Sequence, residues 1–290
     1  MKIVDIFKKK DFLLSFEFFP PKNSESEHVL HETVGALKRF APDFVSITYG
    51  AGGSTRDKTL QWTLDLMEDG LEVMMHLTCI ASSQDEITRI VHTLKSSGIE
   101  NILALRGDAP PDCPPPGPLC HASDLVAYLR ELDGFFSIGV AGYPEGHPEA
   151  ASLEEDITFL KKKVEAGAEF ILTQLFFDNR YFFDFEERVR AAGINVPIIP
   201  GIMPIINPGQ VKKFTQMCGA TVPVGVLSRM EGKNPGETLR IGVDYAIGQC
   251  GELIKAGVSG LHFYTLNRNQ ATGLILDGLK DFSPIRKRTG

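Results

Sequence analysis

Short apolar runs alternate with longer stretches of helical periodicity along the whole chain. Runs of roughly four to eight apolar residues that end at Gly, Pro or polar residues are typical of buried strands. The run from Ile102 to Leu105 is apolar on both faces, as strands of a parallel sheet are. The pattern predicts strands at residues 13–19, 44–49, 73–79, 102–105, 136–141, 170–177, 197–203 and 260–266.

Between the predicted strands, apolar residues recur at intervals of three and four, which indicates amphipathic helices. The longest helix is predicted from about Gly236 to Ala256, residues 221–235 are predicted to be irregular, and residues 110–118 form a proline-rich connection. Three helix starts are predicted from Ser-x-x-Glu capping boxes, at Ser24 and Glu27, Ser83 and Glu86, and Ser152 and Glu155.

Strands and helices alternate eight times in one chain, and no linker-like segment interrupts them. This order predicts an α/β fold, a single-domain (β/α)8 TIM barrel over residues 1–290. An open, doubly wound parallel sheet is the alternative. A dinucleotide-binding sheet of that kind has Gly-x-Gly-x-x-Gly after its first strand, and this chain has no such motif there.

Composition narrows the partners of the predicted barrel. The formal net charge is −7 and the longest basic runs are three lysines, so no nucleic-acid partner is expected. No apolar run is long enough to cross a bilayer, and residues 1–10 hold no apolar signal core, so no membrane association is expected. The five cysteines are scattered without a Cys-x-x-Cys pair, which predicts no metal site and indicates reduced thiols in a cytoplasmic protein.

Polar side chains stand at the ends of most predicted strands, where barrel enzymes place their active sites. Glu17 lies between Phe16 and Phe18, and apolar surroundings favour the protonated form of a carboxyl group, which suits a general acid. Gly107 lets the backbone turn sharply or approach a ligand closely. The other candidates at strand ends are Thr48, Tyr49, His76, Arg106, Asp108, Tyr143, His147, Gln174, Tyr264 and Arg268.

Each candidate also has an ordinary structural explanation. Glu17 could point outward and pair with a lysine, and His76 could be a hydrogen-bonded core residue. Arg106 and Asp108 could be a surface loop pair, and residues 161–163 could be a solvated lysine face of a helix. The residues alone therefore indicate only a barrel enzyme that binds a planar, anionic ligand.

Seven motifs follow one another in order along nearly the whole chain. They are FEFFPPK at residues 16–22, TYGAGG at 48–53, HLTC at 76–79, LRGD at 105–108, AGYPEGHPEA at 141–150, TQLFFD at 173–178 and HFYTLNR at 262–268. Together they resemble the 5,10-methylenetetrahydrofolate reductase family. The chain is most similar to the short bacterial type, which lacks the C-terminal regulatory domain of the larger animal enzymes.

The resemblance implies a flavoprotein oxidoreductase of one-carbon metabolism and methionine biosynthesis. It implies that FAD carries hydride through flavin N5, from NAD(P)H to 5,10-methylenetetrahydrofolate, giving 5-methyltetrahydrofolate with ping-pong kinetics. Glu17 matches the family's general acid, which protonates a folate nitrogen as the five-membered ring opens. Asp108 matches the residue beside flavin and pterin, where a negative group helps bind the cationic folate intermediate. These two residues are the expected catalytic groups.

The same resemblance implies the binding residues. Phe214 matches an aromatic residue whose place is shared between the donor and folate, whereas Phe159 stands where some relatives have a polar residue. Cofactor contacts are expected at Thr48, Tyr49, Ala51, His76, Arg106, Gly107, Asp108, Ala122, Tyr143, His147, Ala150, Asp156 and Lys163. Substrate contacts are expected at Glu17, Asp108, Gln174, Gln210, Phe214 and Arg268.

The implied partners are the folate substrate and NAD(P)H or another electron donor. The expected assembly is a homo-oligomer, which could include an electron-transfer partner subunit. Two other functions stay open: a different flavin barrel, such as a proline dehydrogenase-like oxidase, and a non-catalytic subunit that holds flavin for an electron-transferring partner. Dependence on folate would separate the first of these from the leading hypothesis.

Overall fold

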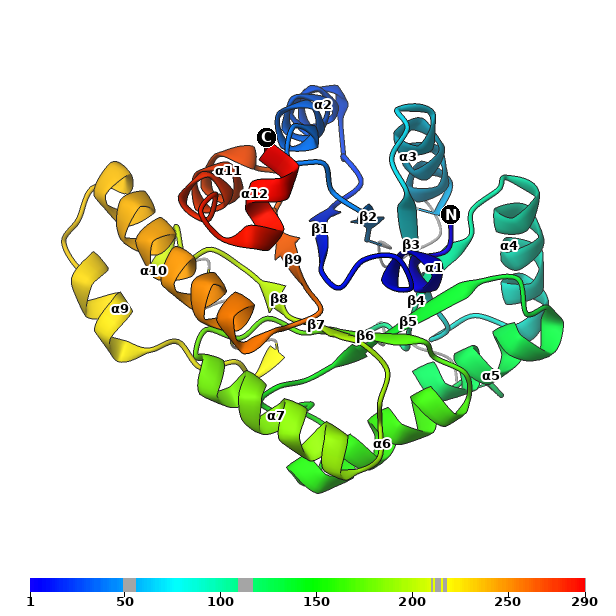
Figure 1. The fold of residues 1–290 in the computed structure, drawn as a ribbon. Helices are drawn as coiled ribbons and strands as arrows, with labels where there is room; N and C mark the ends of the chain where they lie inside the picture. Colours follow the sequence, from blue (N-terminus) through cyan, green and yellow to red (C-terminus); the bar gives the residue numbers. More distant parts are fainter. Residues whose placement is uncertain (49–55, 109–116, 210, 212–214, 216–217, 290) are drawn as a thin grey trace.

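The strands form one parallel sheet that curls into a barrel, and helices surround it (Figure 1). The computed structural model describes residues 1–48, 56–108, 117–209, 211, 215 and 218–289. Neighbouring strands follow the order β7-β6-β5-β4-β3-β2-β1-β9-β8. The predicted (β/α)8 barrel is therefore confirmed, and the open doubly wound sheet is not observed.

The described elements follow the predicted alternation of strand and helix. The strands are β1 Leu13–Phe18, β2 Phe44–Ile47, β3 Val73–Thr78, β4 Asn101–Leu105, β5 Ser137–Gly142, β6 Phe170–Thr173, β7 Ile198–Ile199, β8 Gly201–Ile202 and β9 Gly260–Tyr264. The helices are α1 Ile3–Phe7, α2 Ser24–Lys38, α3 Arg56–Glu68, α4 Gln84–Ser96, α5 Ala122–Leu132, α6 Leu153–Glu165, α7 Asn179–Ala191, α9 Val224–Met230, α10 Pro235–Ala256, α11 Asn269–Gly278 and α12 Ser283–Thr289.

The predicted seventh strand is present in two halves, and these halves close the barrel. β7 pairs with β6, β8 pairs with β9, and Pro200 lies between the halves. Proline has no backbone N–H and so interrupts a ladder. Its carbonyl still accepts a hydrogen bond from the backbone N–H of His262 at 3.0 Å, which continues the contact with β9.

Helix α1 covers the end of the barrel at which the strands begin (Figure 1). Its Ile3 and Ile6 pack with the inward-facing apolar side chains of the strands, Leu13, Phe44, Met74, Leu103, Phe170, Leu172 and Ile199. The first N–H groups of a helix have no partner within it. Here the backbone N–H of Ile3 donates to Asn101 Oδ1 at 2.7 Å, and that of Val4 donates to Ser137 Oγ at 3.2 Å. Strand residues thus cap the helix that closes the base.

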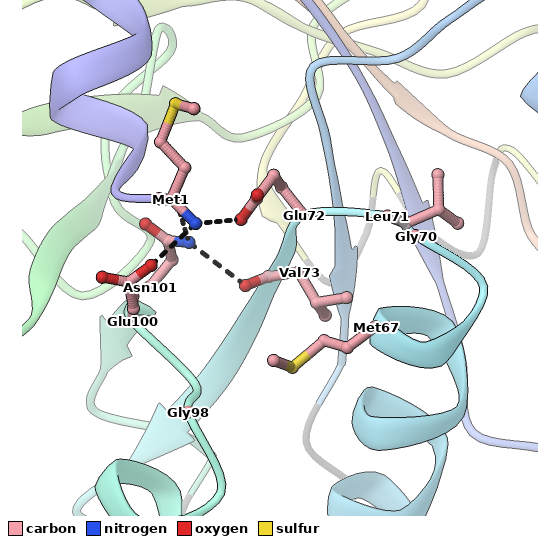
Figure 2. A pocket seen from close by; sticks show the side chains of 9 residues that line it. All are labelled: Met1, Met67, Gly70, Leu71, Glu72, Val73, Gly98, Glu100 and Asn101. Atoms are coloured by element: carbon pink, nitrogen blue, oxygen red, sulfur yellow. Dashed lines mark hydrogen bonds and ion pairs between the residues drawn. The ribbon is translucent and has the colours of Figure 1, made fainter.

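The same end of the barrel holds a pocket of about 200 Å³ between the starts of β3 and β4 (Figure 2). The amino group of Met1 lies 2.5 Å from Glu72 Oε2 and 2.7 Å from Glu100 Oε2. Barrel enzymes place their chemistry at the opposite end, and residues at this end usually contribute to stability. The pocket is therefore part of the base and is not the candidate site.

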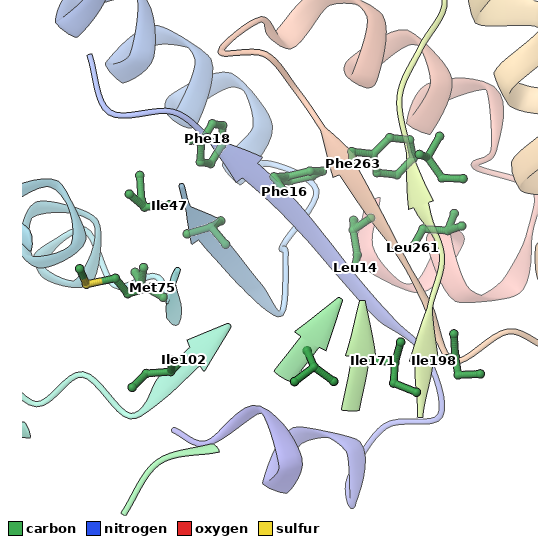
Figure 3. Packing of buried hydrophobic residues seen from close by; sticks show 14 of the residues in the cluster. Leu14, Phe16, Phe18, Ile47, Met75, Ile102, Ile171, Ile198, Leu261 and Phe263 are labelled. Carbon is green, nitrogen blue, oxygen red and sulfur yellow. The ribbon is translucent and has the colours of Figure 1, made fainter. Parts of the chain in front are cut away.

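The larger hydrophobic cluster lies between the strands and the helices (Figure 3). Successive strand residues point to opposite faces. On β1, Leu14, Phe16 and Phe18 join this outer cluster, whereas Ser15 and Glu17 face the barrel interior. Fully burying a large apolar side chain contributes about 1.5–3 kcal/mol, so this layer supplies most of the hydrophobic stabilisation.

Two local predictions are corrected by the structure. Helix α2 begins with a capping box made by Asn23 and Ser26, one residue before the predicted pair of Ser24 and Glu27. Asn is at least as good an N-cap as Ser, and the residue ahead of Ser24 was the better candidate. Residues 221–235 were predicted to be irregular but contain the short helix α9. The capping box at Ser83 and Glu86 is confirmed. At the start of α6 only half of the predicted box forms: the Ser152 side chain accepts from the Glu155 backbone N–H at 3.2 Å, but the Glu155 carboxylate accepts from the Ala151 N–H at 2.6 Å. Among the described residues, no helix is both long and apolar enough to span a membrane.

Two glycines of α10 should respond in opposite ways to the same substitution. A Cβ on Gly242 would lie 1.8 Å from the Ile205 carbonyl oxygen, whereas a Cβ on exposed Gly248 would meet nothing within 4 Å. We expect Gly242→Ala to lower the free energy of unfolding by at least about 2 kcal/mol through overpacking. We expect Gly248→Ala to raise it by about 0.5–1 kcal/mol, because alanine loses less backbone freedom. Urea unfolding of both variants measures this, and equal effects would contradict the close packing of α10.

Candidate active site

Glu17 lies near the end of β1 with its carboxylate enclosed between two imidazoles. Its side chain is about 7% exposed, and its Oε2 lies 3.4 Å from His76 Nε2 and 3.5 Å from His262 Nε2. Both Nε2 atoms are buried and have no hydrogen-bond partner in the part of the chain that the structure describes. Burial lowers the pKa of His76, and the neighbouring Glu17 carboxylate opposes this shift. A buried acid therefore lies beside two ring nitrogens that have no hydrogen-bond partner among the described residues.

The surroundings of Glu17 differ from the prediction. Its sequence neighbours Phe16 and Phe18 belong to the outer cluster on the opposite face of β1, so they do not enclose the carboxylate. The residues that do enclose it, His76 and His262, come from strands on either side of it in the sheet. The explanation that Glu17 points outward and pairs with a lysine is thereby excluded.

His262 was not among the predicted site residues. Its Nδ1 lies 2.8 Å from Ser15 Oγ, which leaves Nε2 directed at Glu17, and its ring packs edge-on against Tyr264 with centroids 5.3 Å apart. The sequence feature that could have identified it is the alternation of side chains along β9, because His262 and Tyr264 are two residues apart and therefore share the inward face. The hydroxyl of Tyr264 donates to the Thr173 carbonyl at 2.7 Å, and burial raises its pKa well above the ordinary value.

Arg106, Gly107 and Asp108 lie immediately after β4. Arg106 makes a bidentate ion pair with Glu149, with Nη1–Oε2 and Nη2–Oε1 distances of 2.5 and 2.7 Å. This pair raises the pKa of Arg106 and lowers that of Glu149. Gly107 has φ +87°, and a Cβ there would lie 2.9 Å from side-chain atoms of Thr78 and Ile80, so only glycine fits this turn. Asp108 is exposed at the strand end.

The loop after β5 and the helix α6 bring together a second group of predicted residues. The ring of Tyr143 packs edge-on against His147 at 4.7 Å, and the Ala150 N–H donates to the His147 carbonyl at 2.9 Å. Burial lowers the pKa of His147, raises that of Asp156 and raises that of Tyr143 to about 12.

Lys163 is partly exposed along its length, but its amine is enclosed by protein. Lys163 Nζ donates to the Ala141 carbonyl at 2.6 Å. Burial lowers the pKa of Lys163 to about 8, and the nearby Asp156 carboxylate opposes this shift. Of the three lysines at 161–163, the structure thus turns this one inward, while Lys161 and Lys162 stay exposed as the solvated-face explanation expects.

The remaining described candidates lie at other points of the same end of the barrel. Thr48 follows β2 and donates its backbone N–H to the Phe18 carbonyl, and Ala122 is the first residue of α5. Gln174 follows β6, where its Oε1 accepts from the Leu175 N–H at 2.9 Å. Arg268 is exposed at the start of α11. Four predicted residues lie outside the described residues, namely Tyr49, Ala51, Gln210 and Phe214.

These residues fall into two sectors around the barrel mouth. One sector, from β4 to α6, carries the Arg106, Tyr143, His147, Asp156 and Lys163 groups that could hold an anionic cofactor. The other sector combines β1, β6 and β9 and carries Glu17, Gln174 and Arg268. Within the described residues, no group of three or more His, Cys, Asp or Glu could hold a metal ion.

Comparison with known proteins explains this combination of fold and site. The sequence profile described as methylenetetrahydrofolate reductase matches residues 2–280. The chain belongs to the methylenetetrahydrofolate reductase family. The predicted enzyme class, an oxidoreductase of this family, is confirmed by named relatives.

Relatives in the methylenetetrahydrofolate reductase family come from bacteria and plants. The 5,10-methylenetetrahydrofolate reductases of Salmonella typhimurium and Escherichia coli are 44% and 43% identical over 258 residues, which cover 88% of this chain and 86% of each relative. The Arabidopsis thaliana protein named methylenetetrahydrofolate reductase (NADH) 1 is 39% identical over 99% of this chain, which spans 52% of the plant protein.

A solved structure supports the fold. It is described as an uncharacterized protein from Clostridium thermocellum that binds two copies of 5-methyl-5,6,7,8-tetrahydrofolic acid. It superposes with a TM-score of 0.68 and covers 97% of this chain and 98% of its own, at 15% identity. At that identity the similarity concerns the barrel architecture alone.

The enclosed amine of Lys163 should make the stability of this methylenetetrahydrofolate reductase family member depend on pH. The folded pKa of about 8 lies below the usual value of 10.5, so between these values the unfolded state binds more protons. Stability due to Lys163 should therefore rise with pH in that window, by at most about 1.4 kcal/mol per pH unit, after being lowest below pH 8.

Urea unfolding of the wild type and Lys163→Met from pH 7 to pH 10 measures this dependence. The difference in unfolding free energy should shift in favour of the wild type as pH rises through about 8. Two parallel curves would show that the amine is not enclosed as described.

Proposed function

We propose that this protein reduces 5,10-methylenetetrahydrofolate to 5-methyltetrahydrofolate with FAD as its cofactor, by a ping-pong reaction that takes electrons from NAD(P)H. The observation that carries the proposal is the enclosed carboxylate of Glu17 at the barrel mouth, beside His76 and His262. The family assignment favours this function over the proline dehydrogenase-like oxidase and the non-catalytic flavin subunit.

Glu17 is the residue that we assign as general acid. A general acid must sit within hydrogen-bond reach of the atom that it protonates and be held in one orientation. The Glu17 backbone is fixed by its carbonyl, which accepts from Thr265 Oγ1 at 2.6 Å, and its side chain is confined by the two imidazoles. His262 is itself oriented by Ser15. Such a group can hold a proton at Oε2 and deliver it to a folate nitrogen bound above it.

The sector from β4 to α6 fits FAD on three observations. Gly107 holds the turn after β4 at φ +87° against Thr78 and Ile80, which fixes where its neighbours Arg106 and Asp108 leave the strand. Arg106, which pairs with Glu149 in this structure, and Lys163 are the cations that we assign to phosphate oxygens, and we assign Asp156 as an acceptor for a ribose hydroxyl. The N-terminus of α5, with Ala122 at its first position, presents backbone N–H groups of the kind that bind anions.

We assign Thr48, Tyr49, Ala51, His76, Asp108, Tyr143, His147 and Ala150 to the same cofactor. When bound, FAD supplies the hydride chemistry, while the protein supplies binding, orientation and proton transfer.

The folate side of the proposed site combines residues from distant parts of the chain. Gln174 offers an amide that can pair with the donors and acceptors of a pterin ring, and Arg268 offers a cation for a carboxylate of the folate tail. We also assign Asp108, exposed just after β4, to the folate, because its negative charge would favour a cationic folate species. Gln210 and Phe214 complete the proposed substrate contacts.

The proposal also names an electron donor and an assembly. The names of the plant relatives give NADH as the donor, and NADPH is the alternative. The Clostridium thermocellum neighbour is described as binding 5-methyltetrahydrofolic acid, which supports a folate ligand for a barrel of this shape. We propose a homo-oligomer, with an electron-transfer partner subunit as the other possibility. The described cysteines Cys79, Cys120, Cys218 and Cys250 are free thiols, which supports a cytoplasmic location.

A visible absorption spectrum of the purified protein tests the function directly. We expect flavin absorption that NADH bleaches without oxygen and that 5,10-methylenetetrahydrofolate then restores. Failure of NADH alone would move the search to NADPH or a partner subunit. A protein that is colourless and takes up no added FAD would overturn the cofactor assignment and most of the proposed site.

Glu17→Gln should separate the two halves of the reaction. The amide keeps the shape of the side chain but cannot donate a proton as a carboxylic acid does, so flavin should stay bound and reducible. Re-oxidation by 5,10-methylenetetrahydrofolate should slow by about 10²–10⁴-fold, the usual contribution of a general acid. Stopped-flow absorbance measures both steps, and exposed Glu165 on α6, changed to Gln, is the matched control. Normal folate turnover in Glu17→Gln would remove this residue from the mechanism.

A further inference from the structure

The loop after β9 is tied to the end of β1 by one side-chain amide. Asn267 Oδ1 accepts from the backbone N–H of Phe19 at 2.8 Å, and Asn267 Nδ2 donates to the Phe19 carbonyl at 2.8 Å. Both backbone polar groups of Phe19 are therefore paired with a residue 248 positions away in sequence. The contact lies two residues beyond Glu17 and one residue before Arg268.

Further hydrogen bonds extend this link to Glu17 itself. The Asn267 backbone N–H donates to Thr265 Oγ1 at 3.2 Å, and Thr265 Oγ1 donates to the Glu17 carbonyl at 2.6 Å. The Arg268 backbone N–H donates to the Thr265 carbonyl at 3.0 Å. From the other side, Thr33 Oγ1 on α2 donates to the Asn267 carbonyl at 3.0 Å. The residues that carry the proposed acid and the proposed folate cation thus share one network.

The backbone at this loop is held in an unusual conformation. Leu266 and Asn267 have φ values of +53° and +55°, and together with Ala41 and Ala81 they are the described non-glycine residues with positive φ. Asn tolerates the left-handed region better than most residues, whereas Leu does so at a cost. A strained conformation persists only where surrounding contacts fix it, and such strain gathers at functional sites. The amide pairing with Phe19 supplies those contacts.

We propose that Asn267 is a positioning residue for the folate step, because its side-chain amide fixes the loop that carries Arg268 against the strand end that carries Glu17. This inference rests on the proposed function. The two folate-side groups are 251 positions apart in sequence, so their spacing depends on contacts across the β1–β9 seam. The groups that we assign to flavin between β4 and α6 make none of these hydrogen bonds across the seam.

Two substitutions distinguish the amide from the backbone conformation. Gly and Asp both tolerate positive φ, so Asn267→Gly and Asn267→Asp keep the loop geometry accessible. Asn267→Gly loses both bonds to Phe19, and Asn267→Asp places a second oxygen against the Phe19 carbonyl. Thr33→Val is the matched control, because it removes one hydrogen bond from the other side of the same loop and leaves the amide pair intact.

The experiment measures the folate half-reaction alone. FAD in each holoprotein is reduced with dithionite, so the natural donor does not matter, and re-oxidation by 5,10-methylenetetrahydrofolate is followed by stopped-flow absorbance. We expect both Asn267 variants to be re-oxidised at least about tenfold more slowly, since small misplacements of reacting groups are costly. Flavin spectrum and FAD affinity should stay unchanged, and Thr33→Val should react at nearly the wild-type rate.

The outcomes separate this inference from the function on which it rests. A wild type that folate does not re-oxidise would overturn the proposed function. If folate re-oxidises the wild type and both Asn267 variants at the same rate, the positioning role is overturned and the proposed function stands. Equal slowing in Thr33→Val and in the Asn267 variants would also overturn it, because general loosening of the loop would then explain the loss.

Discussion

Closure of the parallel sheet at its seventh position is the constraint on which the rest of the structure depends. Without this closure, β6 and β9 would each lack a neighbouring strand on one side. The halves β7 and β8 instead pair one with each, and Pro200 between them still accepts from His262. The first and last strands, β1 and β9, also pair directly, in a register that sets Ser15 beside His262 and Glu17 beside Tyr264. This pairing brings the candidate acid together with the residues that orient it, although they come from opposite ends of the chain.

The barrel interior divides into an apolar base, which stabilises the fold, and a polar mouth, whose buried polar groups cost stability. At the base, Ile3 and Ile6 of α1 fill the space between inward-facing apolar side chains. Towards the mouth, Ser46 Oγ and the Nε2 atoms of His76 and His262 are buried without a hydrogen-bond partner among the described residues. An unsatisfied buried polar group costs about 1–3 kcal/mol. The apolar base and the outer cluster must offset that cost, and a polar ligand that pairs with these atoms would relieve part of it.

The alternation of strands and helices was predictable, because short bounded apolar runs and the 3.6-residue helical period are local properties of the sequence. The start of α2 was missed by one residue, because the Ser24 and Glu27 spacing was preferred over the equally good N-cap Asn23. The site was predictable only in part. The positions of polar residues at strand ends predicted Glu17, His76 and Arg106 as site residues. Sequence adjacency, however, suggested that Phe16 and Phe18 enclose the Glu17 carboxylate, and in the structure they lie on the opposite face of β1. His262 and Glu149 were missed because their roles come from contacts across strands and loops.

The two sectors of the mouth differ in how they are assembled, and this difference bears on the proposed two-step reaction. The proposed cofactor sector runs from Arg106 to Lys163 through elements that are consecutive in the chain. The folate sector joins β1 to β9 across the seam, and its spacing relies on register and on the bonds of Thr265 and Asn267. Loosening the seam should therefore disturb the spacing of Glu17 and Arg268 before it disturbs the cofactor groups.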